Sequence, residues 1–207
     1  MSSGPRIAAR ERILRAAILA LSSHGYAGTT ARSIAALGGF APGVIYYHFA
    51  DLDEVFTATA AYTSEQREER YRTALADVTK AVPLIEKLRT LYAEDAESGH
   101  IEAVQELVAA ARPGSPLAAA MAAQTRQWEL LAEEILSRLL RGKPLGRLVN
   151  VPTAARAAVA YYLGMQTLTH LDGDSSRPEA AFGQAARLAA AFDKLPTLRR
   201  RSLSRRS

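Results

Sequence analysis

The stretch from Thr29 to Phe56 (TTARSIAALGGFAPGVIYYHFADLDEVF) constrains the fold more than any other part of the chain. Thr30 suits the N-cap of a short helix, because its hydroxyl can accept from the free N–H groups of the first turn. The pair Gly38-Gly39 ends that helix, since glycine adopts a positive φ at little cost. Pro42 then suits the first position of a second helix, which spans only about residues 42–48 and needs support from other segments. Two short helices joined by a glycine turn predict a helix-turn-helix.

This stretch and the helix before it resemble the DNA-binding domain of the TetR (tetracycline-repressor-like) family of bacterial regulators. The resemblance rests on an ordered set of short motifs, not on one of them alone. The matching residues are Arg10–Leu21, Gly25-Tyr26, Thr30, Ile34-Ala35, Gly39, Gly43, Ile45-Tyr46, His48-Phe49 and Val55-Phe56. It implies a three-helix head whose 42–48 helix enters the DNA major groove. The rest of the chain matches only as an all-helical pattern of suitable length.

The recognition helix offers several kinds of DNA contact. Tyr46, Tyr47 and His48 can donate to phosphates, and Pro42 and Val44 offer apolar contact to thymine methyl groups. Gly43 either lets the backbone approach DNA or permits close packing between helices. The predicted DNA-contact residues are Thr30, Arg32, Pro42, Gly43, Val44, Tyr46, Tyr47 and His48.

Three positions depart from the usual family pattern. Ala41 stands where Ser or Thr is frequent, so we expect the recognition helix to lack a side-chain N-cap, a loss of about 1 kcal/mol. Pro42 and Leu52 stand where the family often has polar contact residues. We therefore expect weaker binding, or readout by shape and apolar contact, with Arg6, Arg10 or the basic tail adding sequence-independent attraction.

The charge is unevenly distributed along the 207 residues. The formal net charge is +5, yet six basic and no acidic residues lie from Lys194 onward, which leaves residues 1–193 at −1. Residues 1–49 carry five arginines and one glutamate. Positive charge at both ends and an acidic centre suit a head that meets phosphate.

The remaining periodic segments all predict helices. They are about 6–24 before the helix-turn-helix, then 52–79, 83–98, 100–112, 117–141, 153–171 and 178–192. Asp51 and Glu54 predict a capping box for the 52–79 helix. Its charge run Glu65–Arg72 is interpreted as a solvated face with pairs such as Glu68–Arg72. The sequence thus predicts an all-α protein: a helix-turn-helix DNA-binding domain (1–50), a larger helical ligand-binding and dimerisation domain (51–193) and a basic disordered tail (194–207).

Alanine-rich faces mark the last two predicted helices. They either pack in the core of one chain or form a two-fold four-helix interface, and the resemblance implies the interface and hence a homodimer. The residues are Ala157, Ala158, Tyr161, Leu168 and Leu171 on one helix, and Ala181, Ala185, Leu188, Ala189 and Phe192 on the other.

The resemblance also implies a small-molecule pocket in the larger domain. The predicted ligand-binding residues are Tyr92, His100, Gln124, Trp128, Tyr162, Met165 and Gln166, with Gln105, Met121 and His170 as further candidates. Apolar walls with a few polar groups are typical of ligand sites. Each of these residues is equally compatible with ordinary core packing.

The sequence lacks the residues and motifs that several classes of protein require. There is no cysteine, which excludes disulfides and thiolate sites, and the four histidines form no metal-binding pair. No nucleophile elbow, phosphate loop, secretory signal or long apolar run occurs. We therefore expect no enzyme, no metal, no cofactor, no membrane partner and a cytoplasmic location.

Together these observations predict a homodimeric, ligand-responsive transcriptional regulator. We expect a repressor that leaves a near-palindromic double-stranded DNA operator when an unknown small-molecule effector binds. The alternative is a helical protein–protein interaction module in which the helix-turn-helix is only structural.

Overall fold

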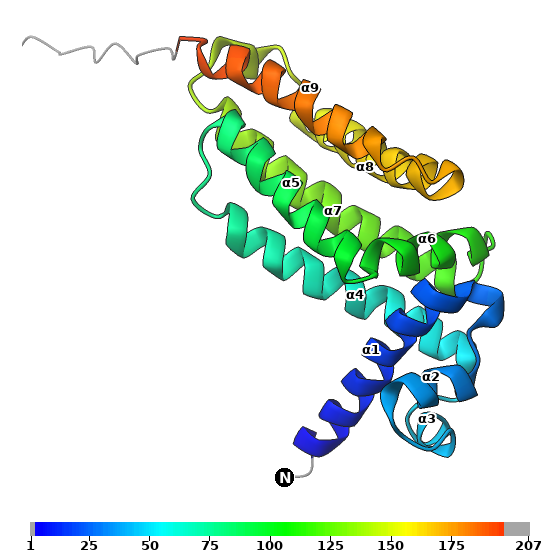
Figure 1. The fold of residues 1–207 in the computed structure, drawn as a ribbon. Coiled ribbons are helices and arrows are strands. Elements are labelled where there is room, and N and C mark those ends of the chain that lie inside the picture. Colours follow the sequence, from blue (N-terminus) through cyan, green and yellow to red (C-terminus); the bar gives the residue numbers. More distant parts are fainter. Residues whose placement is uncertain (1–2, 197–207) are drawn as a thin grey trace, which may run out of the picture.

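The computed structural model describes residues 3–196, and the part of the predicted basic tail from residue 197 onward lies outside the described residues. The described residues form nine α-helices and one 3-10 helix without a strand, which confirms the all-α prediction. The elements are α1 Ser3–Gly28, α2 Ala31–Gly38, α3 Gly43–His48, α4 Leu52–Leu75, α5 Ala81–Glu97, α6 His100–Ala110, α7 Pro116–Leu140, η1 Pro144–Arg147, α8 Val151–Asp172 and α9 Ser176–Asp193. In Figure 1, α1–α3 form a head at one end, and α8 and α9 lie at the opposite end.

The ends of α2 and the start of α4 follow the predicted local signals, whereas α1 continues to Gly28 and the predicted stop at Gly25 is a kink with a φ of 67°. The Thr30 hydroxyl accepts from the Ser33 N–H at 3.1 Å, and Gly39 closes α2 with a φ of 64°. Asp51 caps α4 by accepting from the Glu54 N–H at 2.8 Å. The Glu54 carboxylate reaches one residue further than a capping box requires and accepts from the Ala50 N–H at 2.7 Å.

Helix α4 ends at Leu75, earlier than the predicted 79. The reason is that side chains of neighbouring helices take its last carbonyls. Lys87 of α5 donates to the Ala74 carbonyl at 2.6 Å, and Arg138 of α7 donates to the Leu75 carbonyl at 3.0 Å. Cationic side chains at a helix C-terminus satisfy its free carbonyls and favour a stop there.

Helix α5 begins at Ala81, two residues before the predicted start at Pro83. The carboxylate of Asp193, at the end of α9, accepts from the N–H groups of Ala81 at 2.8 Å and Val82 at 3.0 Å. Pro83 still lies in the first turn, where its missing N–H loses no helical bond. A distant carboxylate therefore performs the N-capping that the local sequence lacks.

Three buried apolar clusters hold the helices together. The head core contains Ile13, Leu14, Ile34, Ile45 and Phe49. A second core packs α4 and α5 on α7 through residues such as Tyr71, Leu91, Leu131 and Ile135. A third core, with Ile18, Leu21, Phe56, Ala103 and Leu107, fixes the end of α1 to α4 and α6 and so joins the head to the body. None of the helices in the described part of the chain is long and apolar enough to cross a membrane.

Candidate nucleic-acid interface and ligand cavity

Helix α3 is held against the head by two buried side chains and by arginines of α1. Ile45 and Phe49 are 0% and 2% exposed and anchor its inner face. Arg10 donates to the His48 carbonyl at 3.0 Å, and its guanidinium lies 4.1 Å from the centre of the Phe49 ring. The guanidinium of Arg10 thus bonds to the head, while its side chain stays 43% exposed. These contacts supply the support that a six-residue helix needs.

The turn between α2 and α3 is fixed from the same helix α1. Arg12 donates from Nε to the Gly38 carbonyl at 2.8 Å and from Nη2 to the Gly39 carbonyl at 2.7 Å. A guanidinium presents its donors in a rigid fork, so two bonds to adjacent carbonyls define the turn closely. Arg12 therefore positions α3 relative to α1.

The outer face of α3 presents most of the predicted contact residues. Tyr46 is 56% exposed and Tyr47 is 74% exposed, while Val44 and His48 are half-buried. Thr30, Arg32, Pro42 and Gly43 are exposed. Val44 packs partly against the head core, which reduces the surface it can offer to a base.

The start of α3 shows how the helix is capped and whether packing requires a glycine at position 43. The helix begins at Gly43, so Pro42 is its N-cap and not its first residue as predicted. The predicted absence of a side-chain cap bond is confirmed. A Cβ placed on Gly43 would meet no atom of the described residues within 4 Å. Packing inside the chain therefore does not require a glycine there, and the open space lies on the exposed side of the helix.

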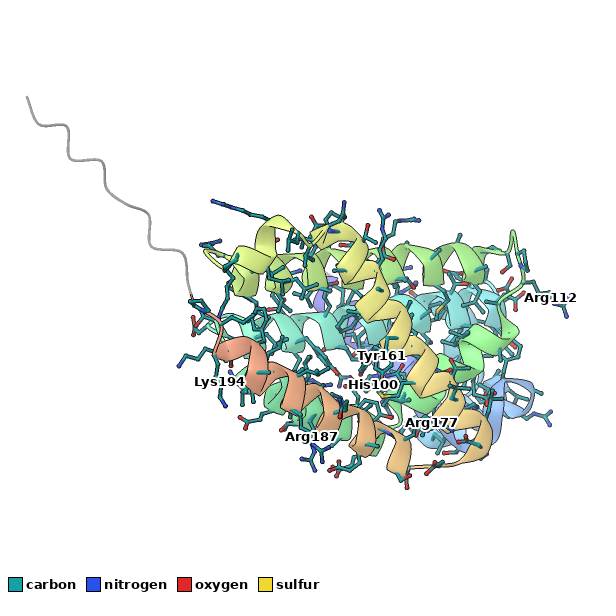
Figure 2. The ribbon with its side chains drawn as sticks, turned by 90° about the horizontal axis from the view of Figure 1, so that it is seen from above. His100, Arg112, Tyr161, Arg177, Arg187 and Lys194 are labelled. Carbon is teal, nitrogen blue, oxygen red and sulfur yellow. The ribbon has the colours of Figure 1, made fainter. Side chains whose placement is uncertain are left out.

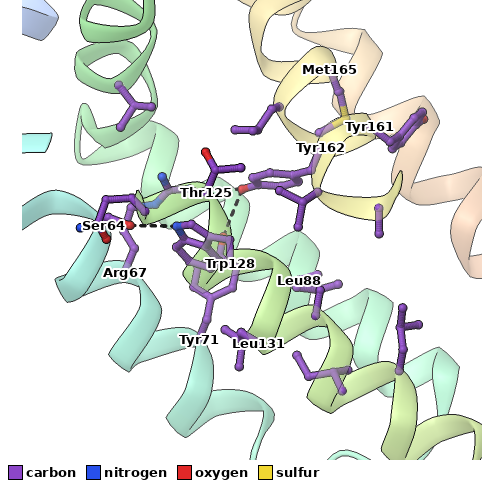
Figure 3. A pocket seen from close by; sticks show the side chains of 18 of the residues that line it. Ser64, Arg67, Tyr71, Leu88, Thr125, Trp128, Leu131, Tyr161, Tyr162 and Met165 are labelled. Atoms are coloured by element: carbon purple, nitrogen blue, oxygen red, sulfur yellow. Dashed lines mark hydrogen bonds between the residues drawn. The ribbon is translucent and has the colours of Figure 1, made fainter. Parts of the chain in front are cut away.

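The larger domain encloses a cavity of about 320 Å³ between α4, α5, α7, α8 and α9. Its walls are mainly aliphatic, with Leu84, Leu88, Leu131, Ile135 and Phe182 among the lining residues. Figure 3 shows Trp128 of α7 and Tyr162 of α8 projecting toward Ser64, Arg67 and Tyr71 of α4. The cavity thus has an apolar body and one polar end.

The polar end is organised around the buried carboxylate of Asp95 on α5. Asp95 is 0% exposed and pairs with Arg67 Nε at 2.7 Å and with Arg70. It also accepts from the Tyr71 hydroxyl at 2.9 Å, and the Tyr71 and Tyr162 hydroxyls are 3.2 Å apart. Charge-assisted hydrogen bonds of this kind fix the side chains in one arrangement.

Two groups near this end have shifted pKa values. Burial raises the pKa of Tyr162 far above its ordinary value, so its hydroxyl stays protonated and can donate. Burial, with help from Arg67 and Arg70, lowers the pKa of His100 to about 4 from 6.5. His100 is consequently neutral near pH 7, and its Nδ1 can accept from the Thr63 hydroxyl.

The structure brings some of the predicted ligand residues together and separates others. Gln124, Trp128, Tyr162 and Met165 line the cavity, together with Met121. Tyr92 does not line it, but its ring packs against Tyr162 with centroids 6.0 Å apart. His100 lines a second, open groove of about 820 Å³ beside α1 and α4, and Arg67 lines both this groove and the cavity.

Gln166 also lies off the cavity. It is 1% exposed, and neither of its amide atoms has a hydrogen-bond partner among the described residues. Gln105 is likewise away from the cavity and accepts from the Thr167 hydroxyl at 2.8 Å. His170 lies 3.5 Å from the Glu106 carboxylate.

Sequence reasoning missed Arg67 and Tyr71, because both lie in the charge run interpreted as a solvated face. The Glu68–Arg72 pair is present at 2.7 Å, as predicted. However, Arg67 is only 6% exposed and Tyr71 only 3%, so this face of the run is buried. The spacing of these two residues, i and i+4 with Ser64 and Ala60 before them, is a helical stripe that could have indicated an inward face.

Helices α8 and α9 expose part of their predicted faces, and Figure 2 draws both helices, with Tyr161 of the α8 face labelled. Tyr161, Leu168, Leu171 and Leu188 are between 50% and 74% exposed. Other members of the set pack within the chain: Ala189 is buried, Phe192 is half-buried, and Ala181 and Ala185 line the cavity. The alanine-rich face of α9 is therefore partly internal core.

Comparisons with known proteins agree with this geometry. The sequence model of the family described as "Bacterial regulatory proteins, tetR family" matches residues 13–59, the segment that contains α2 and α3. The HTH-type transcriptional repressor AcnR of Corynebacterium diphtheriae is 28% identical over 139 residues, which cover 67% of each chain.

Solved structures show the same fold over nearly the whole chain. A TetR-family transcriptional regulator from Rhodococcus sp. superposes with a TM-score of 0.71 at 20% identity, covering 89% of this chain and 98% of that one. The regulator FadR from Bacillus subtilis, solved with stearoyl-CoA, gives a TM-score of 0.69 at 18% identity, with 88% and 98% covered. Residues 13–59 of the head thus match the tetR family of bacterial regulatory proteins, and the described chain as a whole shares the helical fold of these solved regulators.

Proposed function

We propose that this protein is a ligand-responsive DNA-binding transcriptional regulator, and specifically a repressor. The observation that carries the proposal is the outer face of α3, a rigidly held short helix with Tyr46 and Tyr47 exposed and open space at Gly43. A helix of this kind after a tight turn fits the major groove. We propose the DNA-contact residues to be Thr30, Arg32, Pro42, Gly43, Val44, Tyr46, Tyr47 and His48. A regulator that binds DNA acts where the bacterial chromosome lies, so we place it in the cytoplasm.

Selection of bound sequences from a random DNA pool tests this function. We expect a near-palindromic consensus and an affinity that falls steeply with salt, because bound phosphates release counterions. Tyr47→Ala should weaken binding to the selected sequence by about tenfold or more, since it removes an exposed contact of the recognition helix. Leu148→Ala is the matched control, because Leu148 is 83% exposed on the loop before α8, remote from the head.

The same experiment addresses the rival function. A protein–protein interaction module with a purely structural helix-turn-helix should enrich no sequence and show no salt-dependent shift. Such a result, with folded protein, would reject the regulator.

We propose that the exposed residues of α8 and α9 form a two-fold interface between copies of this chain. Large apolar side chains grouped on one surface favour association, and Tyr161, Leu168, Leu171 and Leu188 are all at least half exposed. Leu171→Asp should shift the protein from dimer to monomer in sedimentation velocity, whereas Leu148→Asp should not. Wild-type protein sedimenting as a monomer at micromolar concentration would contradict the interface.

We propose that the effector occupies the cavity between α4, α5, α7, α8 and α9. The route to the head is the contact between α6 and α1, where Glu106 accepts from the Tyr26 N–H at 2.6 Å beside the kink at Gly25. An effector that prefers one arrangement of these helices shifts the population toward it. By linkage, an effector that weakens DNA binding must itself be bound more weakly, by the same factor, when DNA is present.

A further inference from the structure

The charge that lines the cavity is of one sign. Among the lining residues, Arg67 is the one that carries a charge at neutral pH, and no aspartate or glutamate lines the walls in the described part of the chain. A buried cation raises the cost of admitting a second cation and lowers the cost of admitting an anion. The charge of the wall thus selects among ligands of similar shape.

Several N–H donors of Arg67 form no hydrogen bond with the described residues. Of its five N–H groups, the one on Nε bonds to Asp95 at 2.7 Å, and Nη2 makes a long contact of 3.4 Å to the Tyr162 hydroxyl. Its guanidinium also lies 5.3 Å from the centre of the Trp128 ring. Because Arg67 is only 6% exposed, bulk water has little access to the remaining donors.

The carboxylate that balances Arg67 is shared. Asp95 pairs with both Arg67 and Arg70 and also accepts from the Tyr71 hydroxyl. The other acid near Arg70 is Glu94, which lies 3.9 Å away and is 49% exposed, so solvent screens its charge. Asp95 is therefore shared between the buried Arg67 and Arg70, whose side chain is 37% exposed, and of these two arginines Arg67 is the one that lines the cavity.

We propose that the effector is an apolar carboxylic acid whose carboxylate binds the guanidinium of Arg67. This inference rests on the proposed function, in which the cavity takes the effector. A guanidinium edge matches a carboxylate with two parallel hydrogen bonds, and the protonated Tyr162 hydroxyl adjoins the same place. The apolar body of the acid lies along Leu84, Leu88 and Ile135.

The volume sets the size of the acid. A cavity of about 320 Å³ holds roughly ten non-hydrogen atoms, since a water molecule takes about 30 Å³ of liquid volume. Decanoate, 1-decanol and decylamine are suitable probes, because they share one chain and differ in the charge of the head group. Trp128, the single tryptophan of the chain, lines the cavity and reports binding by its fluorescence without any DNA present.

The structure predicts an order of affinity for the full-length protein. Decanoate should bind at least about tenfold more tightly than 1-decanol, and decylamine should bind most weakly, because the carboxylate alone gains charge-assisted hydrogen bonds to Arg67. Equal binding of the three probes, tighter binding of decylamine, or no saturable binding of any of them would overturn the proposal.

Variants locate the preference at Arg67. Arg67→Gln should abolish the advantage of decanoate while leaving 1-decanol binding within about twofold. Because Arg67→Gln leaves Asp95 short of a partner, the double variant Arg67→Gln/Asp95→Asn removes both charges and keeps the test valid if the single variant fails to fold. Arg126→Gln, at an exposed position of α7, is the control and should keep the wild-type order. A preference for decanoate that survives in the double variant would refute the role of Arg67.

The DNA-binding assay separates this inference from the proposed function. If adding decanoate weakens the protein's binding to its specific DNA sequence, the result supports both the proposed function and the acid specificity. If the protein binds operator DNA normally but prefers 1-decanol to decanoate, the acid specificity is wrong and the regulator stands. If decanoate is preferred but the protein binds no DNA sequence specifically, the regulator is wrong and the ligand site stands.

Discussion

Replacing Gly43 by alanine separates a role in DNA contact from a role in folding. Gly43 is the first residue of α3, and a Cβ there would meet no atom of the described residues within 4 Å. Alanine also favours helix over glycine by about 0.5–1 kcal/mol in a helix interior, and by less at an end. The free energy of unfolding should therefore stay unchanged or rise by at most about 1 kcal/mol. For a chain of this length that is a rise in Tm of at most about 2–4 °C.

DNA binding should respond in the opposite direction. If the backbone at Gly43 approaches the DNA, an added methyl group holds the helix away and breaks at least one hydrogen bond to a phosphate. A hydrogen bond to a charged group contributes about 1.5–3 kcal/mol, which corresponds to a loss of affinity of about ten- to a hundredfold.

Two measurements on the same variant give the result. Thermal unfolding followed by circular dichroism reports stability, and fluorescence anisotropy with the selected operator reports affinity. An equally stable Gly43→Ala protein that binds the operator as tightly as wild type would refute close approach at this position. A marked loss of stability would instead contradict the open space in the structure.

Three further outcomes follow from contacts described above. Arg12→Ala should weaken operator binding more than Arg15→Ala, because only Arg12 holds the α2–α3 turn; equal affinities in anisotropy would contradict this positioning role. Because the pKa of His100 is lowered to about 4 from 6.5, the unfolded chain binds a proton that the folded chain does not, so the free energy of unfolding should fall as the pH drops through this window. Urea unfolding should show a shallower fall in His100→Gln, and an identical slope would count against it. Ser64→Ala should cost about 1–3 kcal/mol in urea unfolding and shift the Trp128 emission, because the indole N–H loses its acceptor at 3.0 Å; an unchanged spectrum would indicate another partner.

The head was predictable in detail because its determinants are local. The Thr30 cap acts over three residues, and the Gly39 turn needs only its own φ, so a short window of sequence contains both signals. The apolar positions Ile45 and Phe49 likewise follow helical spacing within the same window.

The contacts that hold the site in place were not predictable, because they join residues far apart in the sequence. The Arg12 bond to Gly38 spans 26 residues, and the Arg67 bond to Asp95 spans 28. No local pattern predicts which arginine side chain of a charge run is buried, because that depends on where a buried carboxylate of another helix lies. The same holds for the early end of α4, which Arg138 sets from 63 residues away.

The Asp193 cap on α5 has a consequence for synthesis. The carboxylate that completes the first turn of α5 is translated 112 residues after Ala81. At synthesis rates of about 5–20 residues per second, the ribosome delivers it on the order of 6–20 s later. During that interval α5 lacks both its cap and the α9 surface it packs on, and the cavity lacks Phe182. The cavity that we propose for the effector is therefore completed last, so a nascent chain can hold a finished head before that cavity is closed.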